Sequence, residues 1–346
     1  MTSPRLIPEF APQSGVMVTW PHSHSDWHNR LDTIEPVYVE ITRTISRYER
    51  VLVICYDDRH LLHVSDLLRQ AGITASTVHC VAVPTNDTWV RDYGPLSVSG
   101  RSRPRLLDFT FDGWGGKYDA AHDNQVSGRL FAAGVFKVPE LDHHPLVLEG
   151  GAIDTDGCGT LLTTTRCLLG SGRNPGMDKT ALEACFHENL GIERTLWLDH
   201  GMLRGDDTDG HVDMLARFCT PQVIAYLQCT DRADEHYDEL SAMEEQLHDF
   251  ITHDGFPYTL CPLPMPQAVY SEDGERLPAS YANFLIINQA VLVPVYNDPV
   301  DRQVLAMLQQ CFPEREIVAI NCLPLIQQYG SLHCATMQLP EGVLQD

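Results

Sequence analysis

Short apolar runs rich in branched side chains recur along the chain and predict strands. Longer segments between them carry apolar residues three and four positions apart, which is the spacing of one helical face. In the expected helix 33–46, this face comprises Ile34, Val37, Ile41 and Ile45. The other expected helices are 174–188, 231–251 and 299–311, and the expected strands are 16–20, 50–55, 78–83, 105–111, 160–165, 223–227, 284–287, 290–295 and 317–321. Strands mixed with helices over the whole length predict an α/β fold.

The pattern is not divided by any linker rich in glycine, serine or charge. The proline-rich stretch 261–266 and the polar loop 271–276 are expected to be surface excursions within one domain. Residues 1–346 are therefore expected to form a single domain. A strand–strand–helix order returns several times, which favours a pseudo-symmetric ring.

Charge narrows the range of partners. The 47 acidic residues outnumber 24 basic ones, so the formal net charge is −23. Such a charge repels nucleic acid and anionic membranes and attracts small cations, so neither nucleic acid nor membrane is expected as a partner. No apolar run approaches the roughly 20 residues that span a bilayer, and residues 1–15 have no apolar signal-like core, so a cytoplasmic location is expected.

The segment 208–213, Thr-Asp-Gly-His-Val-Asp, is the first candidate for chemistry. Its Asp-Gly pair predicts a turn, and a strand is expected to follow. Residues two apart in a strand point to the same face, so His211 and Asp213 are expected to lie side by side. A histidine beside a carboxylate can serve as general acid and base. A pair of metal ligands and a structural histidine are the alternatives.

Acidic side chains also follow the expected strand 78–83 and the apolar run 146–148. Trp89 and Asp92 together offer an aromatic face and a carboxylate, which suit a planar cation. Arg91 could instead pair with a neighbouring aspartate on the surface. Glu149, preceded by Leu146-Val147-Leu148 and followed by two glycines, is expected to point inward, where it needs a partner or a raised pKa. A buried structural ion pair is the alternative.

The chain holds 11 cysteines and no C-x-x-C pair, which predicts reduced, mostly structural thiols. Cys334 follows a histidine near the end of the chain and could act as a nucleophile. A competing cluster, His22, His24, Asp26 and His28, could bind a divalent metal with His211 and Asp213. A solvated polar loop is the preferred interpretation of that cluster.

Taken together, seven segments resemble the agmatine deiminase family, which belongs with the bacterial-type peptidylarginine deiminases to the guanidine-modifying superfamily. They are WVRDYGP (89–95), FDGWGGKYD (111–119), LEGG (148–151), LLTTTRCLLGSGRNPG (161–176), TDGHVD (208–213), SYANFLIINQAVLVPVYND (280–298) and YGSLHCATMQ (329–338). The resemblance covers nearly the whole chain. It implies a five-bladed, pseudo-symmetric α/β propeller of the pentein type, with a site in the central channel and no cofactor or metal.

The resemblance also implies roles for residues at the matching positions. Cys334 corresponds to the nucleophile, His211 to the general acid/base, and Glu149 to the carboxylate that orients them and holds guanidinium. The two acids that grip the guanidinium nitrogens correspond to Asp92 and Asp213, and an aromatic wall of the site corresponds to Trp89. The loop 328–332 departs from many relatives, which read Gly-Gly-Gly-Asn-Ile there, so substrate preference is less fixed than chemistry.

The expected function is therefore hydrolytic deimination of a guanidinium substrate, with agmatine converted to N-carbamoylputrescine and ammonia through a cysteine thiouronium. Agmatine is favoured because a protein of charge −23 attracts a dication, and among the site segments the candidate partners for an arginine carboxylate are Arg91 and Arg173. The alternatives are deimination of free or peptidyl arginine, a metal-dependent amidohydrolase, and a non-catalytic cation-binding protein. A homo-oligomer is possible by analogy with relatives.

Overall fold

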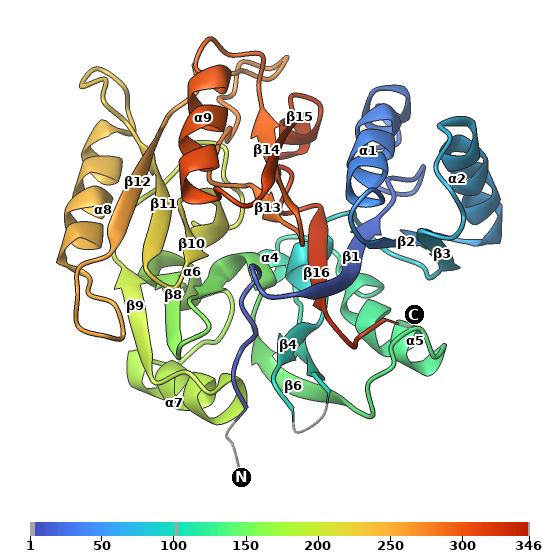
Figure 1. Ribbon diagram of the computed structural model, residues 1–346, viewed down its shortest axis with the longest axis horizontal. Coiled ribbons are helices and arrows are strands. Elements are labelled where there is room, and N and C mark those ends of the chain that lie inside the picture. Colours follow the sequence, from blue (N-terminus) through green and yellow to red (C-terminus); the bar gives the residue numbers. More distant parts are fainter. Residues whose placement is uncertain (1–3, 101–102, 345–346) are drawn as a thin grey trace.

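In the computed structural model, which describes residues 4–100 and 103–344, the strands form five separate sheets (Figure 1). One sheet joins segments from both ends of the chain: β16 (Thr336–Pro340), β1 (Gln13–Thr19), β2 (Arg50–Cys55) and β3 (Val78–Ala82). The others are β4 (Leu96–Val98), β5 (Arg105–Thr110) and β6 (Leu141–Val147); β7 (Ile153–Thr155), β8 (Thr160–Thr164) and β9 (Arg194–Leu198); β10 (Ala216–Thr220), β11 (Val223–Gln228) and β12 (Thr259–Pro264); β13 (Leu285–Ile286), β14 (Ala290–Val295) and β15 (Glu316–Asn321).

The same strand order is used in every one of these sheets. The first strand is antiparallel to the second, and the second is parallel to the third, as in β4, β5 and β6. In the sheet that joins both ends, β16 occupies the place of the first strand and is antiparallel to β1. The repeat that the sequence suggested is therefore a repeat of structure, carried by segments of different sequence.

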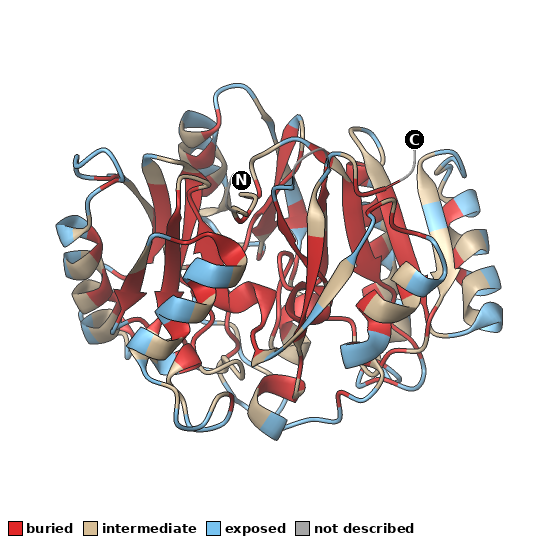
Figure 2. Cartoon of the chain, turned by 90° about the horizontal axis from the view of Figure 1, so that it is seen from below, coloured by how far each residue is buried: buried red, intermediate tan, exposed pale blue. Residues whose placement is uncertain are grey.

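Helices connect the parallel strands, because a parallel pair needs a crossover. They are α1 (Leu31–Ile45), α2 (Asp58–Gln70), α5 (Val126–Ala132), α7 (Lys179–Leu190), α8 (Tyr237–Asp249) and α9 (Asp301–Cys311). Helix α1 confirms the periodicity prediction, because Ile34, Val37, Ile41 and Ile45 are all buried. Figure 2 shows the strands mostly buried and the helices exposing one side.

The prediction for 261–266 was wrong. Instead of a surface excursion, most of this stretch is strand β12, which lies parallel to β11 at the edge of its sheet. Pro262 and Pro264 both belong to it. An edge strand tolerates proline because one row of its backbone groups has no strand partner.

A single hydrophobic cluster extends from Leu6 to Leu344, so the described chain is one α/β domain. Among the described helices, none combines the length and the apolar character that a membrane crossing requires.

Short helical turns lie just before the first strands of three sheets: α3 (Val90–Tyr93) before β4, η2 (Gly150–Ala152) before β7, and η3 (Val212–Met214) before β10. Asp92 and Asp213 lie in these turns, and Trp89, Glu149 and His211 immediately precede them.

Candidate active site

A cavity opens among the turns that precede the first strands. Its wall combines a thiol, four aromatic rings and five aspartates. The lining residues are Asp26, Asp87, Trp89, Asp92, Trp114, Tyr118, Asp206, Asp207, Thr208, Met214, Gln328, Tyr329, Gly330 and Cys334. Three of the predicted site residues, Trp89, Asp92 and Cys334, therefore line one cavity. Three others, Glu149, His211 and Asp213, lie directly behind that wall and are almost fully buried.

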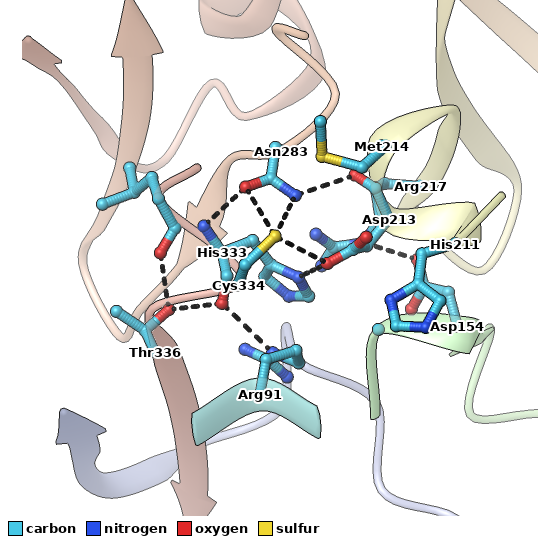
Figure 3. A network of polar contacts seen from close by, with 12 residues as sticks. Arg91, Asp154, His211, Asp213, Met214, Arg217, Asn283, His333, Cys334 and Thr336 are labelled. Carbon is cyan, nitrogen blue, oxygen red and sulfur yellow. Dashed lines mark hydrogen bonds and ion pairs between the residues drawn. The ribbon is translucent and has the colours of Figure 1, made fainter. Parts of the chain in front are cut away.

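Cys334 lies two positions before β16, and 7% of the residue is exposed. Its Sγ atom lies 3.8 Å from Oδ2 of Asp213 and accepts a hydrogen bond of 3.4 Å from Nδ2 of Asn283 (Figure 3). Burial raises the pKa of the Cys334 thiol well above its usual range, and the charges of Asp213 and Asp92 raise it further. The free protein therefore holds a thiol, and a cation bound among these carboxylates would favour the thiolate.

Asp92 lies in α3, where both of its carboxylate oxygens accept hydrogen bonds. Oδ2 accepts one of 2.9 Å from Nε1 of Trp114, and Oδ1 accepts one of 3.0 Å from the backbone of Gly151. Burial and the nearby charges of Asp213 and Glu149 raise the pKa of Asp92 well above its usual range. The sequence analysis gave Trp114 no role, although it belongs to the quoted segment 111–119. In the structure it orients Asp92 and lines the cavity.

Asp213 differs from Asp92 because a histidine holds it. Oδ2 of Asp213 lies 2.7 Å from Nδ1 of His333, and the other ring nitrogen of His333 lies 2.6 Å from Oε2 of Glu9. Burial alone would raise the pKa of Asp213, but His333, with smaller contributions from His211 and Arg217, lowers it. His333 thus bridges the carboxylates of Asp213 and Glu9 through its two ring nitrogens.

Glu9 was missed by sequence reasoning. This carboxylate, 5% exposed, also lies 3.0 Å from Arg217 and 3.4 Å from Arg91. Arg217 in turn lies 3.0 Å from Asp154. Three carboxylates thus face three basic side chains in a buried network beneath the cavity, part of which is drawn in Figure 3: Glu9, Asp154 and Asp213 with Arg91, Arg217 and His333. Arg91 is therefore neither a surface residue nor part of the cavity wall.

His211 precedes η3 rather than entering a strand, so that part of the prediction was wrong. The turn at Asp209 and Gly210 is present, since both have positive φ, but residues 212–214 form a 3₁₀ turn. The rule that residues two apart share a face therefore does not apply. His211 and Asp213 still lie in one neighbourhood, and Asp213 stands between His211 and Cys334 in Figure 3.

The side chain of His211 is unusually free for a buried group. Neither ring nitrogen has a hydrogen-bond partner among the described residues, and Nδ1 lies 3.6 Å from Oδ1 of Asp92. Burial lowers the pKa of His211 to about 3, so the ring is neutral near neutral pH. A neutral imidazole with both nitrogens open can accept a proton from one group and give it to another.

Glu149 is fully buried, as the sequence predicted, and it has a cationic partner. Its Oε1 atom accepts a 2.6 Å bond from Nε of Arg173, while Oε2 has no partner in the described part of the chain. Burial raises the pKa of Glu149, although Arg173 counteracts this effect. Arg173 is itself held by Asp209 and by the backbone oxygen of Thr208. Glu149 therefore offers one open oxygen close to His211.

Two glycines in the quoted segments make close packing around the site possible. A Cβ atom on Gly151 would lie 2.6 Å from Nδ1 of His211 and 2.8 Å from Oδ1 of Asp92, too close for any side chain. A Cβ atom on Gly330 would lie 2.4 Å from the ring of Trp89. That ring also packs against Trp27, with centroids 6.0 Å apart. Glycine at these positions allows the backbone to approach the site directly.

The metal-ligand alternative is not supported by the geometry. His22 and His24 contact Tyr56 and each other, and His22 bonds Thr85. Within residues 4–100 and 103–344, neither histidine belongs to a group of three or more ligand atoms close enough to share an ion. One such group does include His211, with Glu149 and Cys167. The ligands that the amidohydrolase hypothesis requires, His22, His24, His211 and Asp213, are thus not brought together.

The sequence model of the Porphyromonas-type peptidyl-arginine deiminase family matches residues 5–340. The chain belongs to this family. The family membership that the seven segments indicated is thereby confirmed.

Relatives resemble the chain over nearly its full length. The agmatine deiminase of Pseudomonas fluorescens (strain SBW25) is 31% identical over 96% of this chain and 94% of its own. A structure described as a putative arginine deiminase from Porphyromonas gingivalis is 46% identical, covers 99% of this chain and 100% of its own, and has a TM-score of 0.92. A substrate-bound Cys-to-Ser variant of C. jejuni agmatine deiminase is 35% identical, covers 98% and 97%, and has a TM-score of 0.91.

Proposed function

We propose that residues 1–346 form one deiminase domain that hydrolyses the guanidine group of agmatine, giving N-carbamoylputrescine and ammonia. The names of the relatives support guanidine deimination in general, since they include agmatine, arginine and peptidyl-arginine deiminases. The five sheets with a common strand order serve as the five blades of a propeller. The turns before their first strands converge on the cavity, and the reaction takes place there.

The buried carboxylates prepare the substrate. Asp92 and Asp213 hold the guanidinium nitrogens and Glu149 adds its open oxygen, so that charge is fixed around the central carbon. The ring of Trp89 covers the planar cation. Asp213, kept ionised by His333, provides a charge that is present before the cation binds, whereas Asp92 carries a proton in the free protein and releases it on binding.

The covalent steps then follow with balanced protons. The sulfur of Cys334 forms a bond to the guanidinium carbon, and the thiol proton passes to the neutral ring of His211. His211 returns this proton to a nitrogen, ammonia leaves, and a thiouronium remains. Water then attacks the same carbon while His211 accepts its proton. The carbon–sulfur bond breaks, His211 returns its proton to the sulfur, and the ureido product is released as the remaining hydroxyl proton passes to solvent. The Cys-to-Ser variant used for the substrate-bound relative supports this role of cysteine.

The observation that carries the choice of agmatine is that the described cavity wall offers carboxyl groups and no basic side chain. Five of the residues that line it are aspartates, and in the wall as the described residues form it there is no lysine or arginine. Lys117 lies nearby, but its Nζ atom is 2.9 Å from Asp209 and 2.6 Å from the backbone oxygen of Asp207. Agmatine carries an amine at its far end, whereas arginine adds a carboxylate that this wall would repel.

The test is a comparison of kcat/KM for agmatine, free arginine and a peptidyl-arginine ester at one pH and ionic strength. Agmatine should exceed both of the others. Asp207→Asn should then reduce kcat/KM for agmatine about two- to fivefold and leave that for arginine unchanged or higher, because Asp207 is partly exposed. Asp254→Asn, at an exposed position outside the cavity wall, is the matched control. Equal or better turnover of arginine would overturn the substrate assignment but not the deiminase chemistry.

A further inference from the structure

A group of metal-ligating side chains lies away from the cavity, between two neighbouring sheets. Asp156 and Cys158 belong to the turn that joins β7 to β8, and His253 belongs to the loop 250–258 that connects α8 to β12. A carboxylate oxygen, a sulfur and a ring nitrogen, one from each side chain, all lie within 4.8 Å of one another. Asp156 follows β7 whereas Glu149 precedes it, so this group is at the opposite end of that strand from the proposed reaction.

The carboxylate of Asp156 has one oxygen in use and one free. Oδ1 accepts hydrogen bonds from the backbone nitrogens of Cys158 at 2.7 Å and Thr160 at 2.9 Å, which fixes the side chain within the turn. Oδ2 is buried and has no hydrogen-bond partner among the described residues, and Asp156 as a whole is 0% exposed. Such an oxygen is costly, because it has lost its water without gaining a partner. A bound cation would supply that partner.

The other two side chains leave the group accessible. Cys158 is partly exposed and His253 is exposed, so an ion can reach Asp156 from solvent. Nε2 of His253 lies 3.1 Å from Oδ1 of Asp254. A carboxylate at one ring nitrogen commonly accompanies a metal-ligating histidine, because it orients the ring and raises its basicity. The three side chains thus combine a buried, oriented anchor with an open approach.

We propose that Asp156, Cys158 and His253 bind a zinc ion that links the sheet β7–β9 to the sheet β10–β12. Thiolate, imidazole and carboxylate are the ligands that zinc takes, and three of them leave the fourth position of a tetrahedron for water. The sulfur disfavours calcium and magnesium, which prefer oxygen.

The role of this ion would be structural. Arg194, in β9, already donates a 3.0 Å hydrogen bond to the hydroxyl of Tyr258, just before β12, so the zinc would add a second link between the same parts of the chain. Metal bound in the folded state but not in the unfolded chain stabilises the protein. Because the ion lies outside the cavity, it takes no part in the proposed reaction. Its removal should lower stability and leave turnover unchanged.

The experiment uses the full chain, freed of metal with a chelator and then titrated with Zn²⁺ by competition calorimetry. Cys158→Ala removes the sulfur. Asp156→Asn removes the charge but keeps an oxygen for the two backbone nitrogens, so the turn is preserved. Cys185→Ala is the matched control, since Cys185 is also a partly exposed free cysteine and belongs to no group of metal ligands within residues 4–100 and 103–344. Thermal unfolding is followed with and without zinc.

Alkylation by iodoacetamide locates the ion in the wild-type protein, because a thiolate bound to zinc is protected. The rates at Cys158 and Cys185 are measured by peptide-resolved mass spectrometry, with and without Zn²⁺. We expect zinc to slow alkylation of Cys158 at least about tenfold and to leave Cys185 unchanged. Asp156→Asn should abolish most of this protection. Where a variant fails to fold, the wild-type rates alone decide the question.

We expect wild type and Cys185→Ala to bind one equivalent of zinc that Cys158→Ala and Asp156→Asn bind at least about a hundredfold more weakly. Zinc should raise the midpoint of thermal unfolding by several degrees only in the proteins that bind this equivalent. Equal zinc affinity in all four folded proteins overturns the proposal. Alkylation of Cys158 in wild type at the same rate with and without zinc overturns it as well.

Discussion

The buried network beneath the cavity predicts that Glu9→Gln destabilises the protein strongly. The substitution keeps the size and shape of the side chain and removes one negative charge. Three basic side chains, Arg91, Arg217 and His333, then remain against two carboxylates. Loss of one partner from a buried charge network typically costs about 3–5 kcal/mol, because desolvated charge is left without compensation. We expect a loss of this size in the free energy of unfolding.

The matched control is Glu193→Gln, the same substitution in a surface pair. Glu193 lies 2.8 Å from Arg5, but the two side chains are 65% and 42% exposed. Such pairs contribute less than about 1 kcal/mol. Urea denaturation of the three proteins, analysed by linear extrapolation, gives the free energies directly. A destabilisation by Glu9→Gln no larger than that of Glu193→Gln would refute the assigned role of the network.

The pH dependence provides a second check on the same residue. Burial alone would raise the pKa of Glu9, but Arg217, His333 and Arg91 lower it far below its usual range. A lowered folded pKa means that the stabilisation is complete above the unfolded value of about 4.3 and is lost as pH falls towards the folded value. The gap between wild type and Glu9→Gln should therefore be constant near neutral pH and shrink below about pH 4.

Four further outcomes follow from the site. Cys334→Ala should retain agmatine binding in calorimetry and lose more than about a thousandfold in kcat; near-normal turnover would exclude it as the nucleophile. Agmatine affinity of that variant should increase as pH rises, because Asp92 must release a proton, and adding Asp92→Asn should flatten this dependence. Gly151→Ala should lower kcat roughly a hundredfold by displacing His211 and Asp92, while Gly128→Ala, whose new Cβ would make an ordinary contact, should leave kcat unchanged. Exhaustive chelation should leave turnover unchanged, and activity restored by zinc would revive the amidohydrolase hypothesis.

Local patterns predicted much of this fold. Apolar periodicity located α1 and most strands, because burial on one face imposes the same spacing wherever an element packs. The errors came where local rules compete with tertiary context. The run at 211–213 was expected to be extended, but a 3₁₀ turn brings it to the cavity. The prolines near 262 suggested a loop, but they lie on an edge strand where a missing N–H is tolerated.

Sequence reasoning located the candidate site residues mainly where the chemistry of a side chain is unusual for its surroundings. Glu149 behind an apolar run, and a histidine beside an aspartate, were both found in this way. The contact between Glu9 and His333 could not be found in this way, since it joins residues 324 positions apart. Asn283 was missed for a similar reason, because only the fold places this lone asparagine beside the sulfur of Cys334.

The pairing of β16 with β1 has a consequence for the order in which the protein is made. Met17 faces Met337 in this pair, so the partners are separated by 320 positions (337 − 17). A ribosome adds roughly 5–20 residues each second, and folding begins on the emerging chain. The segments with Asp92, Glu149 and His211 therefore leave the ribosome well before Cys334 does. The carboxylates of the site are therefore synthesised before its proposed nucleophile, which takes its place when β16 pairs with β1.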